Sequence, residues 1–134
     1  MRKVDCIIVH HTATPSTATV ESIRNYHVNV RGWRDIGYHY LIQRDGVIRL
    51  GRHEEIIGAH CSGHNAVSIG VAVIGNFEEA ISNGEVAAQM RALECLLGDL
   101  VFRYPGACVV PHRKLAATLC PGRYLVGWLD ERWQ

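Results

Sequence analysis

The 134-residue sequence has the length of one domain, and its 48% of hydrophobic residues is typical of an ordinary globular protein rather than a disordered chain. A net charge of +1 argues against the broad basic surface of a nucleic-acid-binding protein. No stretch approaches the roughly 20 apolar residues of a membrane span, and the N-terminus lacks the apolar core of a secretory signal. We therefore expect a single domain over residues 1–134, made in the cytoplasm, and monomeric by default.

The first half of the chain predicts a strand, a helix and a hairpin. The apolar run at 6–10 is typical of a buried strand, and Ser16 or Thr19 is suited to cap a helix that continues to about Val28. Alternation over 38–43, a turn at Arg44-Asp45-Gly46 and a second run to Leu50 predict two antiparallel strands. His53, Glu54 and Glu55 then suggest a solvated turn.

The second half predicts the centre of the sheet and two more helices. Residues 68–74 are almost continuously apolar, which favours a central strand covered on both faces. Helical spacing over 85–104 predicts the longest helix, residues 109–111 another short strand, and 124–133 a last helix with Trp128 and Leu129 inward. The fold class is α/β, with a central mixed sheet of about five strands flanked by helices in two or three layers.

Two histidines and one cysteine form a candidate metal site. His10 ends the first strand, His112 directly follows a later one, and Cys120 follows a loop long enough to fold back toward both. Two imidazoles and a thiolate would give zinc three protein ligands and leave one position open, as in catalytic sites. Strand-end histidines and buried cysteines also occur without a metal, and spacing alone leaves both interpretations open.

The other four cysteines show no short-spaced pattern of a disulfide framework. We expect them to be reduced thiols.

Five sequence blocks, taken together and in order, resemble the type 2 zinc-dependent N-acetylmuramoyl-L-alanine amidases, a family that includes small phage lysozymes and peptidoglycan recognition proteins. The resemblance covers nearly the whole chain and is strongest for the phage lysozymes. It implies the amidase and peptidoglycan-recognition fold. The blocks are IIVHHTAT from Ile7, IRNYH from Ile23, GWRDIGYHYLIQRDG from Gly32, GAHCSGHNAVSIGVAVIGNF from Gly58 and PHRKLAATLCPG from Pro111.

The resemblance assigns roles at the site. The zinc ligands of the family fall on His10, His112 and Cys120. Tyr38 matches a tyrosine beside the metal, suited to hydrogen-bond the zinc-bound water or the developing oxyanion. Thr118 stands where phage lysozymes carry a lysine and several active recognition proteins carry threonine.

One branch of the family uses a glutamate at the position of Ala72, so no carboxylate is expected there as general base. Zinc would then supply most of the chemistry.

Further polar residues are candidates for substrate contacts. His60 matches a groove histidine of the family, and Asn65 lies in the same loop, where a purely structural role is equally compatible. We expect Trp33 to pack in the core rather than to contact the substrate. We expect the walls of the groove to come from loops 11–18, 32–37, 58–67 and 111–121.

The implied activity is hydrolysis of the amide between N-acetylmuramic acid and L-alanine in peptidoglycan or muropeptide fragments. A phage or prophage endolysin, which reaches the wall after release, fits best. The alternatives are a non-catalytic peptidoglycan recognition module, although such modules typically lose the cysteine present here as Cys120, and a cytoplasmic muropeptide-recycling amidase. Some small phage lysozymes also bind the RNA polymerase of their phage, but the sequence carries no signature of this.

Overall fold

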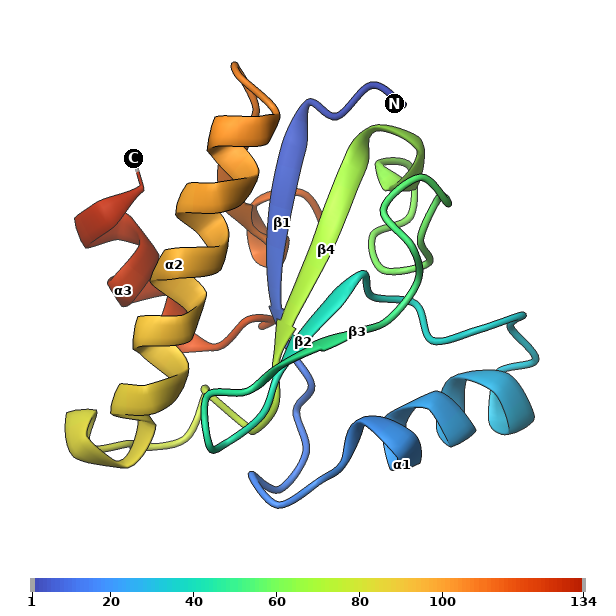
Figure 1. The fold of residues 1–134 in the computed structure, drawn as a ribbon. Coiled ribbons are helices and arrows are strands. Elements are labelled where there is room, and N and C mark those ends of the chain that lie inside the picture. Colours follow the sequence, from blue (N-terminus) through green and yellow to red (C-terminus); the bar gives the residue numbers. More distant parts are fainter. Residues whose placement is uncertain (1, 134) are drawn as a thin grey trace.

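A computed structural model describes residues 2–133 and shows a five-stranded sheet in the order β3-β2-β4-β1-β5 (Figure 1). β1 is parallel to both of its neighbours, β2 is parallel to β4, and only β3 is antiparallel to its partner. The mixed sheet and its hairpin confirm the predicted fold class. The strands are β1 Cys6–His11, β2 Tyr40–Ile42, β3 Ile48–Leu50, β4 Ser68–Val73 and β5 Cys108–Pro111.

Helices cover both faces of this sheet, which makes the domain three-layered. In Figure 1, α2 (Ala87–Arg103) and α3 (Arg123–Arg132) lie on one side, and α1 (Val20–Asn25) lies on the other. The larger hydrophobic core joins α2 and α3 to the sheet, and a smaller one packs α1 near Leu41. No helix within residues 2–133 is long and apolar enough to cross a membrane.

β4 is central, as its apolar sequence predicted. All six of its residues are buried, because helices cover both faces and β1 and β2 flank its edges. Its pairing with β1 places His10 opposite Ala72. The carboxyl ends of the parallel strands β1, β4 and β5 therefore lie side by side at one end of the sheet, where α/β proteins commonly bind ligands.

The first helix differs in form from the prediction. Thr19 caps α1, where its hydroxyl accepts the backbone N–H of Ser22. The helix then widens into a π-helical turn over Tyr26–Val30 instead of continuing as an α-helix to Val28. This turn buries His27, whose Nδ1 accepts the backbone N–H of Gly37 at 2.9 Å. The wider turn thus ties the first helix to the segment that precedes β2.

The other two helices follow their predicted faces. A 3₁₀ turn over Asn83–Val86 leads into α2, whose inward residues include Met90 and Leu93. In α3, Trp128 and Leu129 are buried as expected. Both helices thereby shield the face of the sheet opposite α1.

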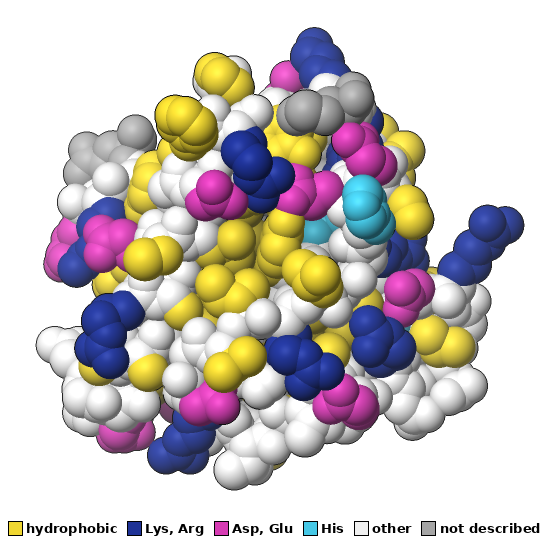
Figure 2. All heavy atoms as spheres, viewed as in Figure 1, with side chains coloured by type: hydrophobic (Ala, Val, Ile, Leu, Met, Phe, Trp, Pro, Cys, Tyr) yellow, Lys and Arg dark blue, Asp and Glu magenta, His cyan; other side chains and the backbone are white. Residues whose placement is uncertain are grey.

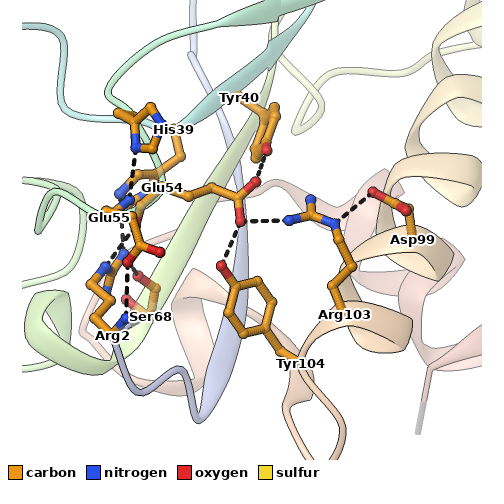
Figure 3. Close-up of polar contacts among 10 residues, drawn as sticks. Arg2, His39, Tyr40, Glu54, Glu55, Ser68, Asp99, Arg103 and Tyr104 are labelled. Carbon is orange, nitrogen blue, oxygen red and sulfur yellow. Dashed lines mark hydrogen bonds and ion pairs between the residues drawn. The ribbon is translucent and has the colours of Figure 1, made fainter.

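The turn predicted to be solvated is instead anchored to the sheet and to α2 through Glu54 (Figure 3). The Glu54 carboxylate accepts hydrogen bonds from Arg103 Nη1 at 2.8 Å, from the Tyr104 hydroxyl at 2.6 Å and from the Tyr40 hydroxyl. Only 15% of its side chain is exposed. Burial alone would raise the pKa of Glu54, but these donors lower it to about 2.

Arg2 also anchors the turn that contains Glu54, through hydrogen bonds to backbone carbonyl groups (Figure 3). Its guanidinium donates to the carbonyl oxygens of Glu54 at 2.7 Å and of Ser68 at 2.6 Å.

On the face shown in Figure 2, positive and negative side chains are interspersed, with hydrophobic side chains exposed between them. This face has no region of a single charge sign, consistent with the nearly neutral composition.

Candidate functional site

His10 and His112 meet because each lies at the carboxyl end of a strand. His10 is the fifth residue of β1 and is 1% exposed, whereas His112 follows β5 directly in a 3₁₀ turn. Since β1 and β5 are parallel neighbours, both side chains lie at the same end of the sheet, where these strands terminate. Their ring centroids are 4.5 Å apart.

The loop after His112 returns Cys120 to the same place. The backbone N–H of Arg113 donates to the Cys120 carbonyl at 2.8 Å and closes this loop. Cys120 Sγ lies 3.6 Å from His10 Nδ1. One ligand atom each from His10, His112 and Cys120 lies within 4.8 Å of the others. The structure thus brings the three predicted ligands together.

The surroundings of these groups suit a metal site. Burial lowers the pKa of His10 well below its usual value, with further repulsion from His60 and His112, and burial also lowers the pKa of His112. Both imidazoles are therefore neutral near pH 7 and have a lone pair to donate. Burial raises the pKa of the Cys120 thiol to about 11, so a cation would have to displace its proton.

An orphaned atom also fits a metal at this point. His112 Nδ1 is buried and has no hydrogen-bond partner within residues 2–133. Buried polar atoms rarely lack a partner, and each such case needs an explanation. A cation between this atom, His10 and Cys120 supplies one, and two imidazole nitrogens with one sulfur form a donor set that suits Zn²⁺.

His60 lies behind His10 rather than only at the groove surface. His60 Nδ1 is 2.8 Å from His10 Nε2, and His60 Nε2 is 3.2 Å from the Ser68 hydroxyl. Gly70 of β4 makes room for this ring, because a Cβ there would lie 2.6 Å from the His60 ring. His60 also lines the cavity, as predicted for a groove residue, but its nearest partner is the candidate ligand His10.

Tyr38 and Thr118 both lie in the wall of the same cavity. The Tyr38 ring centroid is 5.2 Å from that of His10, and burial raises the pKa of its hydroxyl. Thr118 is exposed, and its hydroxyl accepts the backbone N–H of Cys120 at 3.2 Å. Tyr38 thus offers a protonated hydroxyl close to the three candidate ligands, and Thr118 also shapes the loop that carries Cys120.

Asn65 has a different environment from the one predicted for a substrate-binding residue. Its side-chain oxygen accepts the backbone N–H groups of His60 and Cys61, each at 2.9 Å. Within the described chain, Asn65 is not among the residues that line the cavity. The contacts fit the structural alternative, in which Asn65 holds the loop that positions His60.

The three candidate ligands lie in an open cavity of about 1020 Å³. All four predicted loops contribute to its walls, through residues such as Thr12, Trp33, Ala59 and Leu119. Trp33 was expected in the core but lines this cavity. Its ring centroid lies 4.6 Å from that of His27. The cavity is large enough for a ligand the size of a peptide fragment.

Comparison with known proteins identifies the family. The sequence pattern of the family described as N-acetylmuramoyl-L-alanine amidase matches residues 1–123. The chain belongs to this amidase family. The endolysin of Klebsiella phage KP32 is 38% identical over 130 residues, covering 93% of this chain and 85% of that protein.

Two solved structures share the fold. The N-acetylmuramoyl-L-alanine amidase LysC from Clostridium intestinale has a TM-score of 0.86 and 32% identity, covering 97% of this chain and 85% of LysC. A variant of Drosophila PGRP-LB in complex with tracheal cytotoxin has a TM-score of 0.85 and 27% identity, covering 98% and 83%. The family, fold and amidase activity implied by the sequence resemblance are thereby confirmed.

Several residues that line the cavity of the amidase were not predicted from its sequence. Tyr26 reaches the wall from the π-helical turn, Arg31 from the position directly after that turn, and Glu78 from the segment after β4. Arg31 lies with its guanidinium carbon 5.1 Å from the Trp33 ring centroid. Apolar spacing does not distinguish a π-helical turn from an α-helix, and Glu78 lies in a segment for which no role was predicted.

Proposed function

We propose that this amidase cleaves the bond between N-acetylmuramic acid and L-alanine with Zn²⁺ held by His10, His112 and Cys120. The observation that carries the proposal is the convergence of these three donor atoms within 4.8 Å in an open cavity. When bound there, Zn²⁺ would lower the pKa of a water molecule toward 7 and polarise the scissile carbonyl.

The protein residues around the cluster would orient the reacting groups. Tyr38 keeps its proton at neutral pH because burial raises its pKa, so its hydroxyl is available to donate a hydrogen bond to the developing oxyanion. Thr118 provides a neutral hydroxyl on the loop that carries Cys120, and such a hydroxyl stabilises negative charge less than a lysine would. Trp33 and Tyr26 offer apolar walls against which a peptide and a sugar can pack.

The carboxylates near the cluster are not placed as general bases. Position 72 in β4 is a buried alanine. Glu78 lines the cavity, but its carboxylate accepts from Arg123 N–H at 2.9 Å and lies 3.4 Å from Arg113 Nη2. These contacts engage the Glu78 carboxylate in holding the loop around Cys120. Chemistry that depends mainly on the metal is the mechanism that fits these positions.

The biological role proposed is that of an endolysin, acting on the cell wall after release from the cytoplasm in which it is made. The alignments with relatives named endolysins cover most of this chain and most of each relative, which supports this role over muropeptide recycling. A similar recognition protein is solved with tracheal cytotoxin, which supports peptidoglycan or its muropeptide fragments as partner. We propose a monomer as the working form.

The test is digestion of purified peptidoglycan by the zinc-loaded protein, with and without a chelator. Mass spectrometry of the released material should show free stem peptides that begin with L-alanine, and the chelator should abolish their release. Cys120→Ser should release none, whereas Cys95→Ser, which changes an exposed cysteine of α2, should match the wild type. Release that is insensitive to chelator would contradict the proposal, and binding of muropeptides without cleavage would favour a recognition module.

A further inference from the structure

Cys6 and Cys108 form a thiol pair outside the proposed metal site. They occupy paired positions on the neighbouring parallel strands β1 and β5, so both side chains extend from the same face of the sheet. The two Sγ atoms are 3.3 Å apart. Cys108 is exposed and Cys6 is half-buried. A reagent in solution can therefore reach the pair through Cys108.

The backbone geometry already suits a covalent bond. Adjacent strands lie about 4.8 Å apart, which is inside the Cα separation of roughly 4.4 to 6.8 Å found in disulfides. The sulfur atoms would have to approach to about 2.05 Å, a movement of little more than 1 Å that side-chain rotation can supply. The strands themselves would keep their register.

We propose that Cys6 and Cys108 are a disulfide site, oxidised when the protein meets a small-molecule disulfide such as oxidised glutathione. The bond would join β1 to β5, the two strands whose ends carry His10 and His112. It would close a loop between residues separated by 102 positions in the sequence. A closure of that length strongly restricts the unfolded chain.

The exchange proceeds in two balanced steps. The Cys108 thiolate attacks one sulfur of the small disulfide, forms a mixed disulfide and releases one small thiolate. The Cys6 thiolate then attacks Cys108 Sγ, which forms the internal bond and expels the second small thiolate. Two protein thiols and one small disulfide thus become one protein disulfide and two small thiols. Cys108 is the more exposed of the two thiols and therefore reacts first, whereas burial raises the pKa of Cys6 to about 11.

Cys61 is the alternative partner, and the structure disfavours it. Cys61 is 2% exposed and packs with Ile8 and Val110, beneath the layer reached by solvent. Cys6 also packs against this cluster, but its sulfur contact is with Cys108, the residue paired with it in the sheet. The proposal is independent of zinc and of the amidase reaction, because it leaves Cys120 unchanged.

The test uses the full chain carrying Cys95→Ser, which removes an exposed thiol that would otherwise react with glutathione. After incubation with oxidised glutathione, trypsin digestion without reductant and mass spectrometry should show the peptide of Cys6 linked to that of Cys108. Trypsin leaves each cysteine on a separate peptide, so the pairing is unambiguous. The melting temperature should rise by about 5 °C or more and return to its starting value on reduction.

Matched variants identify the sulfurs. Cys61→Ser in the same background should retain the cross-link, whereas Cys6→Ser should stop at a glutathione adduct on Cys108. A cross-link that involves Cys61, or glutathione adducts without any internal bond in the Cys95→Ser protein, would overturn the proposal. Circular dichroism of each variant before oxidation verifies that it is folded.

Discussion

His10 Nε2 lies 2.8 Å from His60 Nδ1, while the other ring nitrogen of His10 faces Cys120 Sγ at 3.6 Å. If His10 Nδ1 binds a metal, Nε2 carries the proton and donates a hydrogen bond to His60 Nδ1. His60 then keeps its own proton on Nε2, which lies 3.2 Å from the Ser68 hydroxyl. The chain of three side chains would fix both the tautomer and the orientation of the ligand.

Replacement of His60 should therefore weaken the metal site. His60→Ala should reduce zinc affinity by about 10-fold to 100-fold, the usual effect of losing a partner behind a ligand. Competition titration against a chromophoric chelator measures the affinity. His64→Ala, in the same loop but outside the described cavity wall, should leave it unchanged. Equal zinc affinity with reduced substrate binding would restrict His60 to a substrate role.

Cys120→Ser should lose stoichiometric zinc while it remains folded. Serine replaces the sulfur with a hydroxyl that gives up its proton far less readily, and a catalytic site contributes less to folding than a structural one. Metal analysis of the dialysed protein and circular dichroism provide the two readouts. Cys95→Ser is the control. Full zinc occupancy in Cys120→Ser would remove this residue from the ligand set.

Tyr38→Phe should separate catalysis from binding. The ring remains against His10, but the hydroxyl that would donate to the oxyanion is lost. We expect kcat to fall by about 10-fold to 1000-fold, with zinc content and muropeptide affinity retained. Turnover on a defined muropeptide measures this effect. An unchanged kcat would make Tyr38 a packing residue.

Glu54 should make stability depend on acid pH. Its pKa lies near 2 in the folded protein, below the usual value of 4.5, so its contribution is complete above pH 4.5 and is lost as pH falls toward 2. At pH 7, Glu54→Gln should lower the free energy of unfolding by about 2 kcal/mol, because the hydrogen bonds lose their charged acceptor. Urea titrations at pH 7 and pH 3 measure this difference, which should shrink at the lower pH.

The exposed Glu79 supplies the control for that experiment. Glu79→Gln should leave stability nearly unchanged at both pH values, since surface substitutions away from such contacts usually have small effects. A pH-independent loss in Glu54→Gln would mean that packing, rather than the charge, accounts for the effect of Glu54.

Sequence patterns predicted the elements that depend on local order. The unbroken apolar run of β4 marked it as central, and the strand ends at His10 and His112 indicated where two candidate ligand side chains emerge. Parallel pairing then brings those ends together by geometry alone. Family resemblance supplied what spacing left open, namely that Cys120 belongs with them.

Local sequence patterns did not predict the long-range contacts. The approach of His60 to His10 depends on a loop held by Asn65 and on space left by Gly70, which no local periodicity encodes. Glu54 looked like a solvated residue because its donors, such as Tyr40 and Arg103, come from distant elements. Buried polar partners of this kind are set by tertiary packing.

The most direct test of the proposed zinc site is anomalous diffraction at the zinc absorption edge from crystals of the zinc-loaded protein. We expect one strong peak within bonding distance, about 2.0 to 2.3 Å, of a nitrogen of His10, a nitrogen of His112 and Cys120 Sγ. A zinc peak elsewhere, or a fully loaded crystal in which any of the three lies outside that distance, would contradict the proposed site.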